Sequence, residues 1–478
     1  MPCLSVDGGR LWFTSNRAGG RDPSGRGGVH REDLWSCERL PGGDWSPAVP
    51  LPGALNTRLS EGSASLSADG GLLVFSACDR PAGPGGCDLF LARPAPGGWS
   101  AGEALTAVNS PAWDSQPALS ALGDALIFAS DRPGGLGGSD LWISRRDARG
   151  GFGSPENLAD LNTSGNEAGP FLHLDGRSLY FSSDGHAGLG GLDLFLSRLG
   201  GNGRWGAPVN LGPPLSTQHP DLGLSVAGDG RQAVFASRRE GRPDLDLYET
   251  RLPDCCPAQP SWLLTGRAIE TGSGRPLPAR LRLEPFGALA SALPDVAQAD
   301  SQGRFAFVLA QGEFQVFAEA PGHLFACALL RAGAPSMERP EPDGLLQVGG
   351  PADTDTLLLC LDPFSPGAHL SLAPLRFAFN QSGIQPESLP LLGQVRDLLA
   401  ARPEARIELR GHTDDVGGDR HNQELSLRRA EAVKRWLVDA GIDAGRIATV
   451  GVGDREPLDR SGGEAARAAN RRTEMWLR

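Results

Sequence analysis

The stretch Ser120–Trp142 reads SALGDALIFASDRPGGLGGSDLW and sets an apolar run between two segments that are rich in Gly, Asp and Pro. The same order of residues occurs five times in the first half of the chain, as S-x-D-G-x-x-L-x-F-x-S-x-R-x-G-G-x-G-G-x-D-L-W. Two positions mark the copies, namely Phe13, Phe75, Phe128, Phe181 and Phe235, and Asp33, Asp88, Asp140, Asp193 and Asp246. The Asp residues follow one another at intervals of 55, 52, 53 and 53 residues, so an internal repeat organises this half of the chain.

Each copy predicts four short antiparallel strands. The first precedes an Asp-Gly turn, the second ends at the marker Phe, the third opens with the Asp-Leu pair, and the fourth follows an aromatic residue. Asp-Gly and Gly-Gly pairs favour tight hairpins because these residues adopt positive φ readily. The aromatic residue of the first four copies is Trp45, Trp99, Phe152 and Trp205 in turn. A repeat of four strands with a period of about 40 to 55 residues is typical of a β-propeller blade.

The five copies resemble the PD40, or TolB-like, branch of the WD40-type propellers. The resemblance implies that the Asp of the third strand and the Ser and Arg after the Phe fix the turns of each blade. We therefore expect residues 1–254 to form an all-β propeller of five blades. The first copy has only a short first strand, and the fifth ends at DLYETRLPDCCP without a fourth strand. Ring closure by pairing these two ends is one expectation. Because the sequence begins abruptly inside a repeat, a lost N-terminal part and a six-bladed parent chain are the alternative.

A different pattern follows residues 255–261, a Pro-bearing segment that we interpret as a linker. Apolar residues alternate in ARLRLEP, GRFAFVL and EFQVFAEA, which predicts half-buried antiparallel strands. Ten positions carry a further resemblance: Gly266, Pro276, Asp300, Gly303, Phe305, Gly312, Val316, Ala318, Gly322 and His323. Residues 262–362 thereby resemble the carboxypeptidase regulatory-like, transthyretin-type β-sandwich. Such modules are spacers or docking surfaces, so no chemistry is expected there.

Residues 363–478 alternate between strand and helix patterns and predict an α+β domain of the βαβαβ type. The expected strands are LRFAF at 375–379, ARIELRG at 405–411, RIATVGVG at 446–453 and RRTEMWLR at 471–478. Pro386 is expected to start the first helix, since Pro is favoured in a first helical turn. The second helix is expected to run from near Asn422 to about Ala440, with an apolar stripe of Leu425, Ala430, Val433 and Leu437.

Four ordered motifs occur in this last segment: G-H-T-D-x-x-G from Gly411, N-x-x-L-S-x-x-R-A from Asn422, G-x-G from Gly451, and A-x-N-R-R-x-E from Ala468. Together they make the segment resemble the OmpA-like, peptidoglycan-associated domain over its whole length. The resemblance implies that Asp414 and Arg429 clasp the charged groups of the diaminopimelate residue of a peptidoglycan stem peptide. Further binding residues carried over from the motifs are Thr413, Asn422, Leu425, Ser426, Arg471 and Arg472.

The charges of the ligand agree with this assignment. The free end of diaminopimelate is zwitterionic, so a receptor needs a carboxylate for its ammonium group and a bidentate guanidinium for its carboxylate. Backbone N–H groups at the start of the second helix, around residues 422–424, are candidates for further donors. We expect surface ion pairs of little energetic weight for Asp415, Asp419, Arg420 and Arg428. Of Arg471 and Arg472, one should pack inward and the other should line the site.

No catalytic motif is present in the sequence. There is no G-x-S-x-G and no H-E-x-x-H, and the eight His residues, which include His30, His173, His186 and His219, show no ligand spacing. The sequence also lacks a C-x-x-C pair, the usual pattern of a zinc site. We therefore expect no enzyme activity, no cofactor and no metal. Cys78 and Cys87 flank a Gly/Pro turn, which leaves either a disulfide or two buried thiols. A propeller-borne hydrolase and a glycan sensor, each held at the cell wall, are the alternative functions.

Composition narrows the class of partner. A chain of 478 residues is longer than the roughly 250 to 300 residues at which a single core stops growing. The net charge of −12 argues against a protein that coats nucleic acid or an anionic membrane. No run of 18 apolar residues predicts a spanning helix, and no export signal is visible at the start. The resemblance implies a periplasmic, outer-membrane-associated protein of a Gram-negative bacterium, which binds peptidoglycan and offers its propeller to an envelope protein partner.

Overall fold

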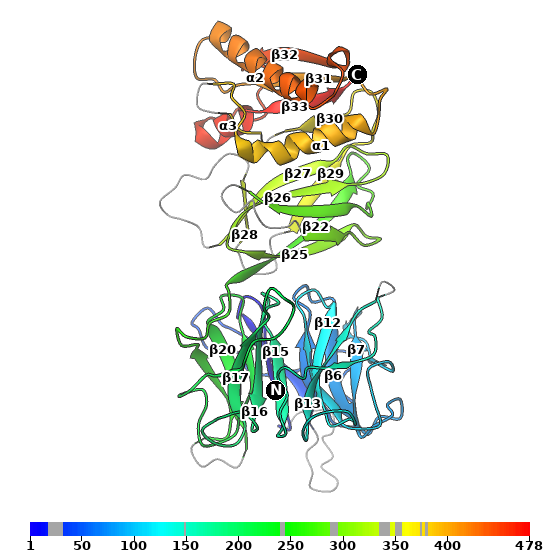
Figure 1. The fold of residues 1–478 in the computed structure, drawn as a ribbon, viewed down its shortest axis with the longest axis vertical. Helices are drawn as coiled ribbons and strands as arrows, with labels where there is room; N and C mark the ends of the chain where they lie inside the picture. The colour runs from blue at the N-terminus through cyan, green and yellow to red at the C-terminus, as the bar shows by residue number, and fades with distance from the viewer. Residues whose placement is uncertain are drawn as a thin grey trace. The chain divides into compact units, whose positions relative to one another are not determined.

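The computed structural model describes residues 1–17, 32–147, 150–239, 244–286, 295–333, 345–348, 356–372, 375–377 and 381–478. These residues fall into two compact units. The first unit is Met1–Leu263 with Val308–Ala310, and the second is Leu264–Phe307 with Gln311–Arg478 (Figure 1). Each unit is described below by itself.

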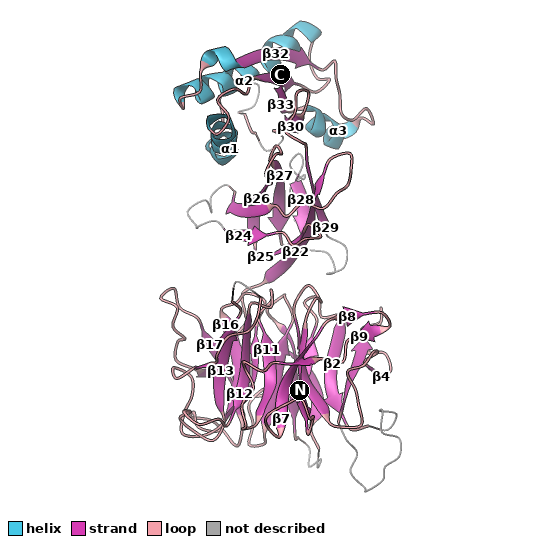
Figure 2. Ribbon diagram, turned by 90° about the vertical axis from the view of Figure 1, so that its right-hand side faces the viewer, coloured by secondary structure: helices cyan, strands magenta, loops and turns pink. Residues whose placement is uncertain are grey.

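The first unit consists of five antiparallel sheets that follow one another along the chain (Figure 2). The first four sheets have four strands each and the fifth has three. The first two sheets comprise β1 (Pro2–Leu4), β2 (Arg10–Ser15), β3 (Asp33–Glu38) and β4 (Val49–Pro50), then β5 (Glu61–Leu66), β6 (Leu73–Cys78), β7 (Cys87–Ala92) and β10 (Glu103–Ala104). The third and fourth comprise β11 (Asp114–Leu119), β12 (Ala125–Ser130), β13 (Asp140–Arg145) and β14 (Glu156–Asn157), then β15 (Glu167–Leu172), β16 (Ser178–Ser183), β17 (Asp193–Arg198) and β18 (Val209–Asn210). The fifth comprises β19 (Asp221–Val226), β20 (Gln232–Ser237) and β21 (Asp246–Arg251), and a small hairpin of β8 (Pro94–Ala95) and β9 (Gly98–Trp99) joins the second copy.

The third strand of each copy begins where the sequence predicts, but the second strand ends later than predicted. The Asp-Leu pair opens or nearly opens β3, β7, β13, β17 and β21 in every copy. The marker Phe does not end the second strand, because each such strand continues for two or three residues beyond it, as from Phe128 to Ser130 in β12. The Phe rings lie mid-strand and buried, since β12 and its equivalents contact neighbouring sheets on both faces.

The first strands of the five sheets contact one another in a closed order: β1 contacts β5, β5 contacts β11, β11 contacts β15, β15 contacts β19, and β19 contacts β1. The N-terminal stub is the first strand of its own sheet and pairs with β2. The expectation that it completes the fifth sheet is therefore wrong. The stub instead contacts the fifth sheet through single hydrogen bonds, such as Leu4 N to Ser225 Oγ at 2.9 Å.

Side chains of the repeat fix its turns, as the resemblance implied. Asp140 accepts a hydrogen bond from Gly137 N at 3.0 Å and thereby holds the Gly-rich hairpin before β13. Arg239 pairs with the buried Asp221 at 2.8 Å, and its guanidinium lies 4.8 Å from the centroid of Phe235. These contacts recur from copy to copy and are internal to the sheets, so the marker residues are structural.

Residues 255–261 are not a free linker. Cys256 and Ala258 are buried in an apolar cluster with Leu252, and the hydroxyl of Tyr180 donates to Cys256 O at 3.0 Å. This segment therefore packs on the first unit, and the following strand begins at Ser261.

Two sheets form the first part of the second unit. One sheet has the order β25-β22-β29 and the other the order β24-β23-β26-β27-β28. Their bounds are β22 (Ser261–Glu270), β23 (Arg280–Pro285), β24 (Asp295–Gln298), β25 (Arg304–Ala310), β26 (Gly312–Glu319), β27 (Ala326–Ala332), β28 (Leu345–Val348) and β29 (Thr356–Leu361). The alternating apolar residues face inward, as the burial pattern of β25 shows. Gly266 is required for close packing, because a Cβ there would lie 2.2 Å from the ring of Phe305.

The C-terminal domain is an α+β structure with a sheet of order β30-β33-β31-β32. Its elements are β30 (His369–Ser371), a 3-10 turn (Pro386–Ser388), α1 (Leu389–Ala400), β31 (Ile407–His412), α2 (Asp419–Asp439), β32 (Ile447–Gly453), α3 (Gly463–Asn470) and β33 (Thr473–Leu477). The edge strand is His369–Ser371 and not the expected 375–379, of which Phe377 forms an isolated bridge with Ile384 and 378–379 lie outside the described residues. Helix α2 begins three residues before the expected Asn422.

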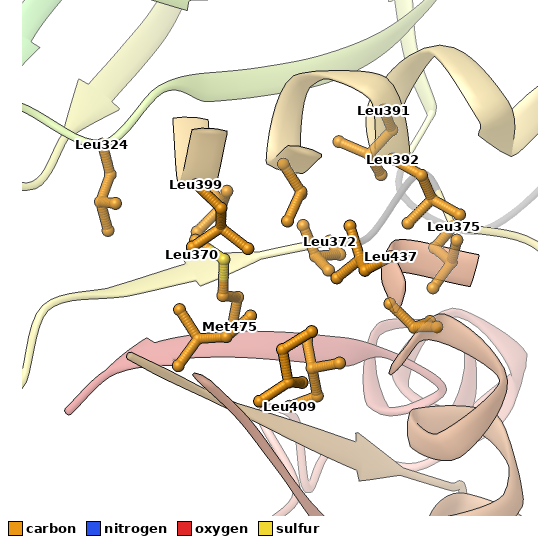
Figure 3. Close-up of a cluster of buried hydrophobic side chains, with 14 of the residues drawn as sticks. Leu324, Leu370, Leu372, Leu375, Leu391, Leu392, Leu399, Leu409, Leu437 and Met475 are labelled. Atoms are coloured by element: carbon orange, nitrogen blue, oxygen red, sulfur yellow. The ribbon is translucent and has the colours of Figure 1, made fainter. Parts of the chain in front are cut away.

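One apolar core joins the C-terminal domain to the preceding sandwich within the second unit (Figure 3). Phe317, Leu324 and Phe325 of the sandwich belong to the same buried cluster as Leu370, Leu399 and Met475. The cluster covers the buried face of α1, which carries Leu391, Val395 and Leu399, and the sheet around Leu409. The sandwich and the C-terminal domain share a core, which favours their unfolding together.

The structure bears on two further expectations, the pairing of Cys78 with Cys87 and the absence of a membrane-spanning helix. Cys78 and Cys87 form a disulfide, at directly opposed positions of β6 and β7, which settles the two alternatives for this pair. No helix in the described part of the chain combines the length and apolarity needed to cross a membrane.

Candidate functional site

The candidate site lies where β31 ends and α2 begins. Two glycines let the helix approach the sheet: a Cβ at Gly411 would lie 2.1 Å from Ser426 O, and one at Gly451 would lie 2.5 Å from Gln423 O. The loop after β31 is held by hydrogen bonds from Thr413 N to Gly453 O at 3.0 Å and from His412 N to Arg472 O at 2.8 Å. The residue that follows, Asp414, is thus placed by rigid elements.

Asp414 is a mostly buried carboxylate that is already paired. Its Oδ2 lies 2.8 Å from Nη1 of Arg471, and its side chain is 15% exposed. Its other oxygen, Oδ1, accepts from Val416 N at 3.2 Å. Arg471 in turn pairs with Glu464 of α3 at 2.8 Å, so the carboxylate belongs to a network of charges.

Arg429 lies near this network, at the middle of α2. Burial lowers the pKa of Arg429, and Arg471 adds to this effect, while Asp414 opposes it as the nearby negative charge. The guanidinium donates through Nε to Gln381 O at 3.2 Å and lies 5.0 Å from the centroid of the Phe377 ring. We call Asp414, Arg429, Arg471 and Glu464 the charged cluster.

The polar residues beneath the charged cluster position it. Asn422 is 2% exposed and donates through Nδ2 to Asp414 O at 3.3 Å. Ser426 is fully buried, where its hydroxyl accepts from Gly453 N at 3.0 Å and donates to Gln423 O at 2.9 Å. Leu425 and Thr413 are 7% and 5% exposed. Four of the expected binding residues are therefore buried, and their role in this structure is to hold the loop and the helix.

Arg472, a further binding residue expected from the motifs, is buried beside the end of β31. Its side chain is 5% exposed, and its Nε donates to Glu474 Oε1 at 2.7 Å. His412 Nε2 lies 3.6 Å from Oε2 of Glu474, and Trp476 Nε1 donates to the same oxygen at 2.8 Å. Burial alone would raise the pKa of Glu474, but these neighbours hold it below its ordinary value. The expected division between the two arginines holds: Arg472 packs inward and Arg471 reaches Asp414.

Of the residues expected in surface ion pairs, Asp415, Arg420 and Arg428 form them. Asp415 pairs with Arg467 at 2.9 Å with 71% of the Asp side chain exposed, and Arg420 pairs with Glu424 at 3.0 Å. The backbone N–H of Asn422 already has a partner at the start of the helix, since it donates to Gly418 O at 3.0 Å. Residues 422–424 therefore do not form the first turn, and the suggested donors lie at the wrong place. The helix begins at Asp419.

Sequence reasoning missed three contributors: Phe377, Gln381 and Glu464. Phe377 and Gln381 reach Arg429 from a segment that precedes α1, and Glu464 reaches Arg471 from α3. Glu464 is seven residues before Arg471, which is two helical turns and a signal that the sequence does contain. The contact of Gln381 is through its backbone, so its side chain gives no clue.

The charged cluster can recognise opposite charges but offers no ion site. Among the residues that the structure describes, no three His, Cys, Asp or Glu side chains are placed to hold a metal ion. Two carboxylates and two guanidinium groups at one edge of the domain are suited to a small zwitterion or to a charged pair on a larger ligand.

Comparisons with known proteins match this part of the chain. Residues 376–471 match the OmpA family. Outer membrane porin F of Pseudomonas fluorescens is 41% identical over 100 residues, covering 21% of this chain and 31% of the porin. Peptidoglycan-binding protein ArfA of Mycobacterium bovis is 34% identical over 116 residues, covering 24% of this chain and 36% of ArfA. The crystal structure of the peptidoglycan-associated lipoprotein from Burkholderia pseudomallei is 31% identical, covers 22% of this chain and 88% of that chain, and gives a TM-score of 0.21.

The matched segment contains the end of β31, helix α2 and the charged cluster. The chain spans about a third of the length of the porin and of ArfA. Residues 376–471 of this chain therefore form a C-terminal domain of the OmpA family.

Proposed function

We propose that the C-terminal domain binds peptidoglycan noncovalently through the charged cluster. The observation that carries this proposal is the presence of Asp414 and Arg429 on rigid elements at one edge of the domain, both held partly out of water. Charge pairs are stronger where solvent is partly excluded. The name of the ArfA relative, a peptidoglycan-binding protein, supports the same ligand.

The ligand group is the zwitterionic end of a diaminopimelate residue in a stem peptide. Asp414 would accept its ammonium group, and Arg429 would bind its carboxylate through two N–H donors. In the structure Arg471 occupies one oxygen of Asp414, and Gln381 O occupies one donor of Arg429. Ligand binding would therefore exchange internal pairs for external ones, which fits a moderate and reversible affinity.

We infer a role without catalysis, in which the rest of the chain is held at the cell wall. We further propose that the five sheets of the first unit form a five-bladed propeller of the PD40 type, and that the sheets of residues 262–362 are a carboxypeptidase regulatory-like module. The closed order of contacts among the five first strands supports the propeller. The propeller would engage a protein partner of the envelope. Outer membrane porin F, as a relative, supports a location in the periplasm at the outer membrane.

Sedimentation with insoluble peptidoglycan tests the binding proposal. Asp414→Ala and Arg429→Ala should each weaken binding by about 2–5 kcal/mol, because each leaves one ligand charge unpaired. Asp415→Ala, which removes only an exposed ion pair with Arg467, is the matched control and should sediment like the parent chain. The proposal fails if Asp414→Ala and Arg429→Ala also sediment like the parent.

A further inference from the structure

The fifth sheet of the first unit lacks the strand that completes the other four. In those four sheets, β4, β10, β14 and β18 each pair with the outer edge of the third strand. In the described part of the chain, no strand pairs with the corresponding edge of β21. An open strand edge presents N–H and C=O groups in a row and is a template for a further strand.

We call the segment that carries the fourth strand of a sheet, together with the residues that follow that strand, the completing segment. One leucine of the third strand shows how this segment is held. Leu141 N donates to Asn162 Oδ1 at 2.8 Å, and Leu141 O accepts from Leu158 N at 3.0 Å. The same pair of contacts is made by Asn56 and Leu51 on Leu34, by Asn109 and Leu105 on Leu89, and by Ser216 and Leu211 on Leu194. The four leucines Leu34, Leu89, Leu141 and Leu194 are fully buried. The fifth, Leu247, is 38% exposed.

The completing segment also fills the space between neighbouring sheets. Leu158 and Leu161 pack in one cluster with Leu179 and Phe181 of the next sheet. Equivalent pairs, Leu51 with Leu55, Leu105 with Val108, and Leu211 with Leu215, lie between the other consecutive sheets. Between the fifth sheet and the first, the cluster of Leu4, Leu11 and Phe13 contains no such pair.

A cavity of about 930 Å³, lined by residues of the first, second, third and fifth sheets, reaches this junction. Leu247, Tyr248 and Glu249 of β21 line one wall, and Leu11 and Phe13 line another. The cavity continues toward side chains of the second and third sheets. Its volume lies near the upper end of the roughly 300–1,000 Å³ of known ligand pockets. The wall residues Leu11 and Phe13 stand at the repeat positions that Leu179 and Phe181 hold beside Leu158 and Leu161.

We propose that this groove binds an extended segment of another polypeptide, which adds to β21 as an antiparallel strand. The partner segment would carry two apolar side chains three or four residues apart, followed by Asn or Ser, as the four internal segments do. One backbone N–H of the segment would donate to Leu247 O, its Asn or Ser side chain would accept from Leu247 N, and its apolar pair would pack beside Leu11 and Phe13. Strand addition of this kind takes affinity from the main chain and specificity from alternate side-chain pockets. The inference rests on the proposed partner-holding role of the first unit and names the chemistry of the partner.

A peptide copy of one internal segment provides the probe. The peptide FGSPENLADLNT, which repeats residues 152–163, should bind the full chain in a calorimetric titration. A peptide methylated on the amide nitrogen of the residue equivalent to Leu158 should bind about tenfold more weakly, because one backbone hydrogen bond is lost and its acceptor stays unpaired. A peptide with Ser in place of both leucines should lose binding, since it cannot fill the cavity.

Substitutions of Leu247 locate the site of binding. Leu247→Pro removes the outward N–H without touching the bonds of β20 and should abolish peptide binding, whereas Leu247→Thr keeps the N–H and should retain it. Unchanged thermal unfolding and unchanged sedimentation with peptidoglycan show that Leu247→Pro is folded. Equal binding of the peptide to Leu247→Pro, or no binding to the parent chain, overturns the inference. A different result is that the peptide binds as expected while the parent chain fails to sediment with peptidoglycan. That result would contradict the proposed peptidoglycan binding and leave the strand-addition inference supported.

Hydrogen exchange and sedimentation velocity test other occupants. In the free chain the amide of Leu247 should exchange far faster than those of Leu34 and Leu141. Slow exchange there would mean that another part of this chain already covers the edge, and the inference would be wrong. A dimer that Leu247→Pro converts to monomer would assign the groove to a second copy of this chain instead of a different partner.

Discussion

Single side chains beneath the charged cluster decide whether the site keeps its shape. Glu474 is 6% exposed and lies among Arg472, His412 and Trp476. A buried carboxylate without its cation is costly, so these residues act as one unit. They support the end of β31, two residues before Asp414.

Removal of the cation from this unit should impair folding. Arg472→Ala should lower the free energy of unfolding by about 3–5 kcal/mol, because the carboxylate of Glu474 is left buried and unpaired. Denaturant titration of the full chain measures this change. In Arg472→Ala/Glu474→Gln the loss should be smaller, and an equal loss in both variants would contradict the pairing.

Acid should weaken the same unit. The neighbours of Glu474 hold its pKa below the ordinary 4.5, so the carboxylate stabilises the fold above that pH. This stabilisation is lost as the pH falls through the lowered pKa of the folded state. The free energy of unfolding should therefore decrease with acidification below pH 4.5 in the parent chain. The decrease should be shallower in Glu474→Gln, and parallel curves for the two proteins would refute the role of this group.

At the scale of elements, the approach of α2 to β31 depends on glycine. The backbone at Gly411 passes so close to Ser426 O that any side chain must push the helix away. The same helix carries Asn422 and Arg429, so the spacing of strand and helix sets the geometry of the charged cluster.

Gly411→Ala should lower the free energy of unfolding by about 1–3 kcal/mol, since the added Cβ overpacks the strand–helix contact. Gly393→Ala in α1 is the matched control. A Cβ at Gly393 would have no atom within 4 Å. Because Ala favours a helix interior over Gly, this control should raise the free energy of unfolding by about 0.5–1 kcal/mol. Thermal unfolding of both variants separates the outcomes. If Gly411→Ala is as stable as the parent, the close approach is not a constraint.

The disulfide between β6 and β7 is the second test at this scale. Cys78→Ser/Cys87→Ser should lower the free energy of unfolding of the first unit by about 2–4 kcal/mol, because the closed loop no longer restricts the unfolded chain. Reduction of the parent chain should give the same shift in its unfolding transition. No shift on reduction would show that this crosslink carries no stability.

The sequence predicted elements well where the pattern is local and poorly where it is not. The five third strands follow from the Asp-Leu pairs, and α2 from its apolar stripe. The edge strand His369–Ser371 is only three residues long and shows no alternation, so the more regular segment 375–379 was the natural choice. Cys256 and Ala258 are buried by Tyr180 and its neighbours, which lie far away in the sequence. Asp414 and Arg429 were identified by the OmpA-like motifs, whereas the inward turn of Arg472 depends on its tertiary contact with Glu474.

At the scale of the whole molecule, one core joins the C-terminal domain of the OmpA family to the two sheets that precede it in the second unit. Phe325 of these sheets and Met475 of the domain belong to one buried apolar cluster. A load on the charged cluster would therefore be carried by the sandwich and the C-terminal domain together.

Phe325→Ala should destabilise both parts at once. The loss should be about 3–5 kcal/mol, as for other aromatic side chains removed from a core. Hydrogen exchange should become faster in β27 of the sandwich and in α1 of the C-terminal domain to a similar extent. Faster exchange in the sandwich alone would show that the two parts unfold independently.

The central claim is that Asp414 and Arg429 together recognise a zwitterion, and a calorimetric titration with two soluble stem peptides tests it most directly. One peptide ends its side chain in diaminopimelate, and the other carries lysine, which has the ammonium group without the second carboxylate. The diaminopimelate peptide should bind, and the lysine peptide should bind more weakly by about 2 kcal/mol or more, since Arg429 then has no anion to pair with. Equal affinities of the two peptides would contradict the claim.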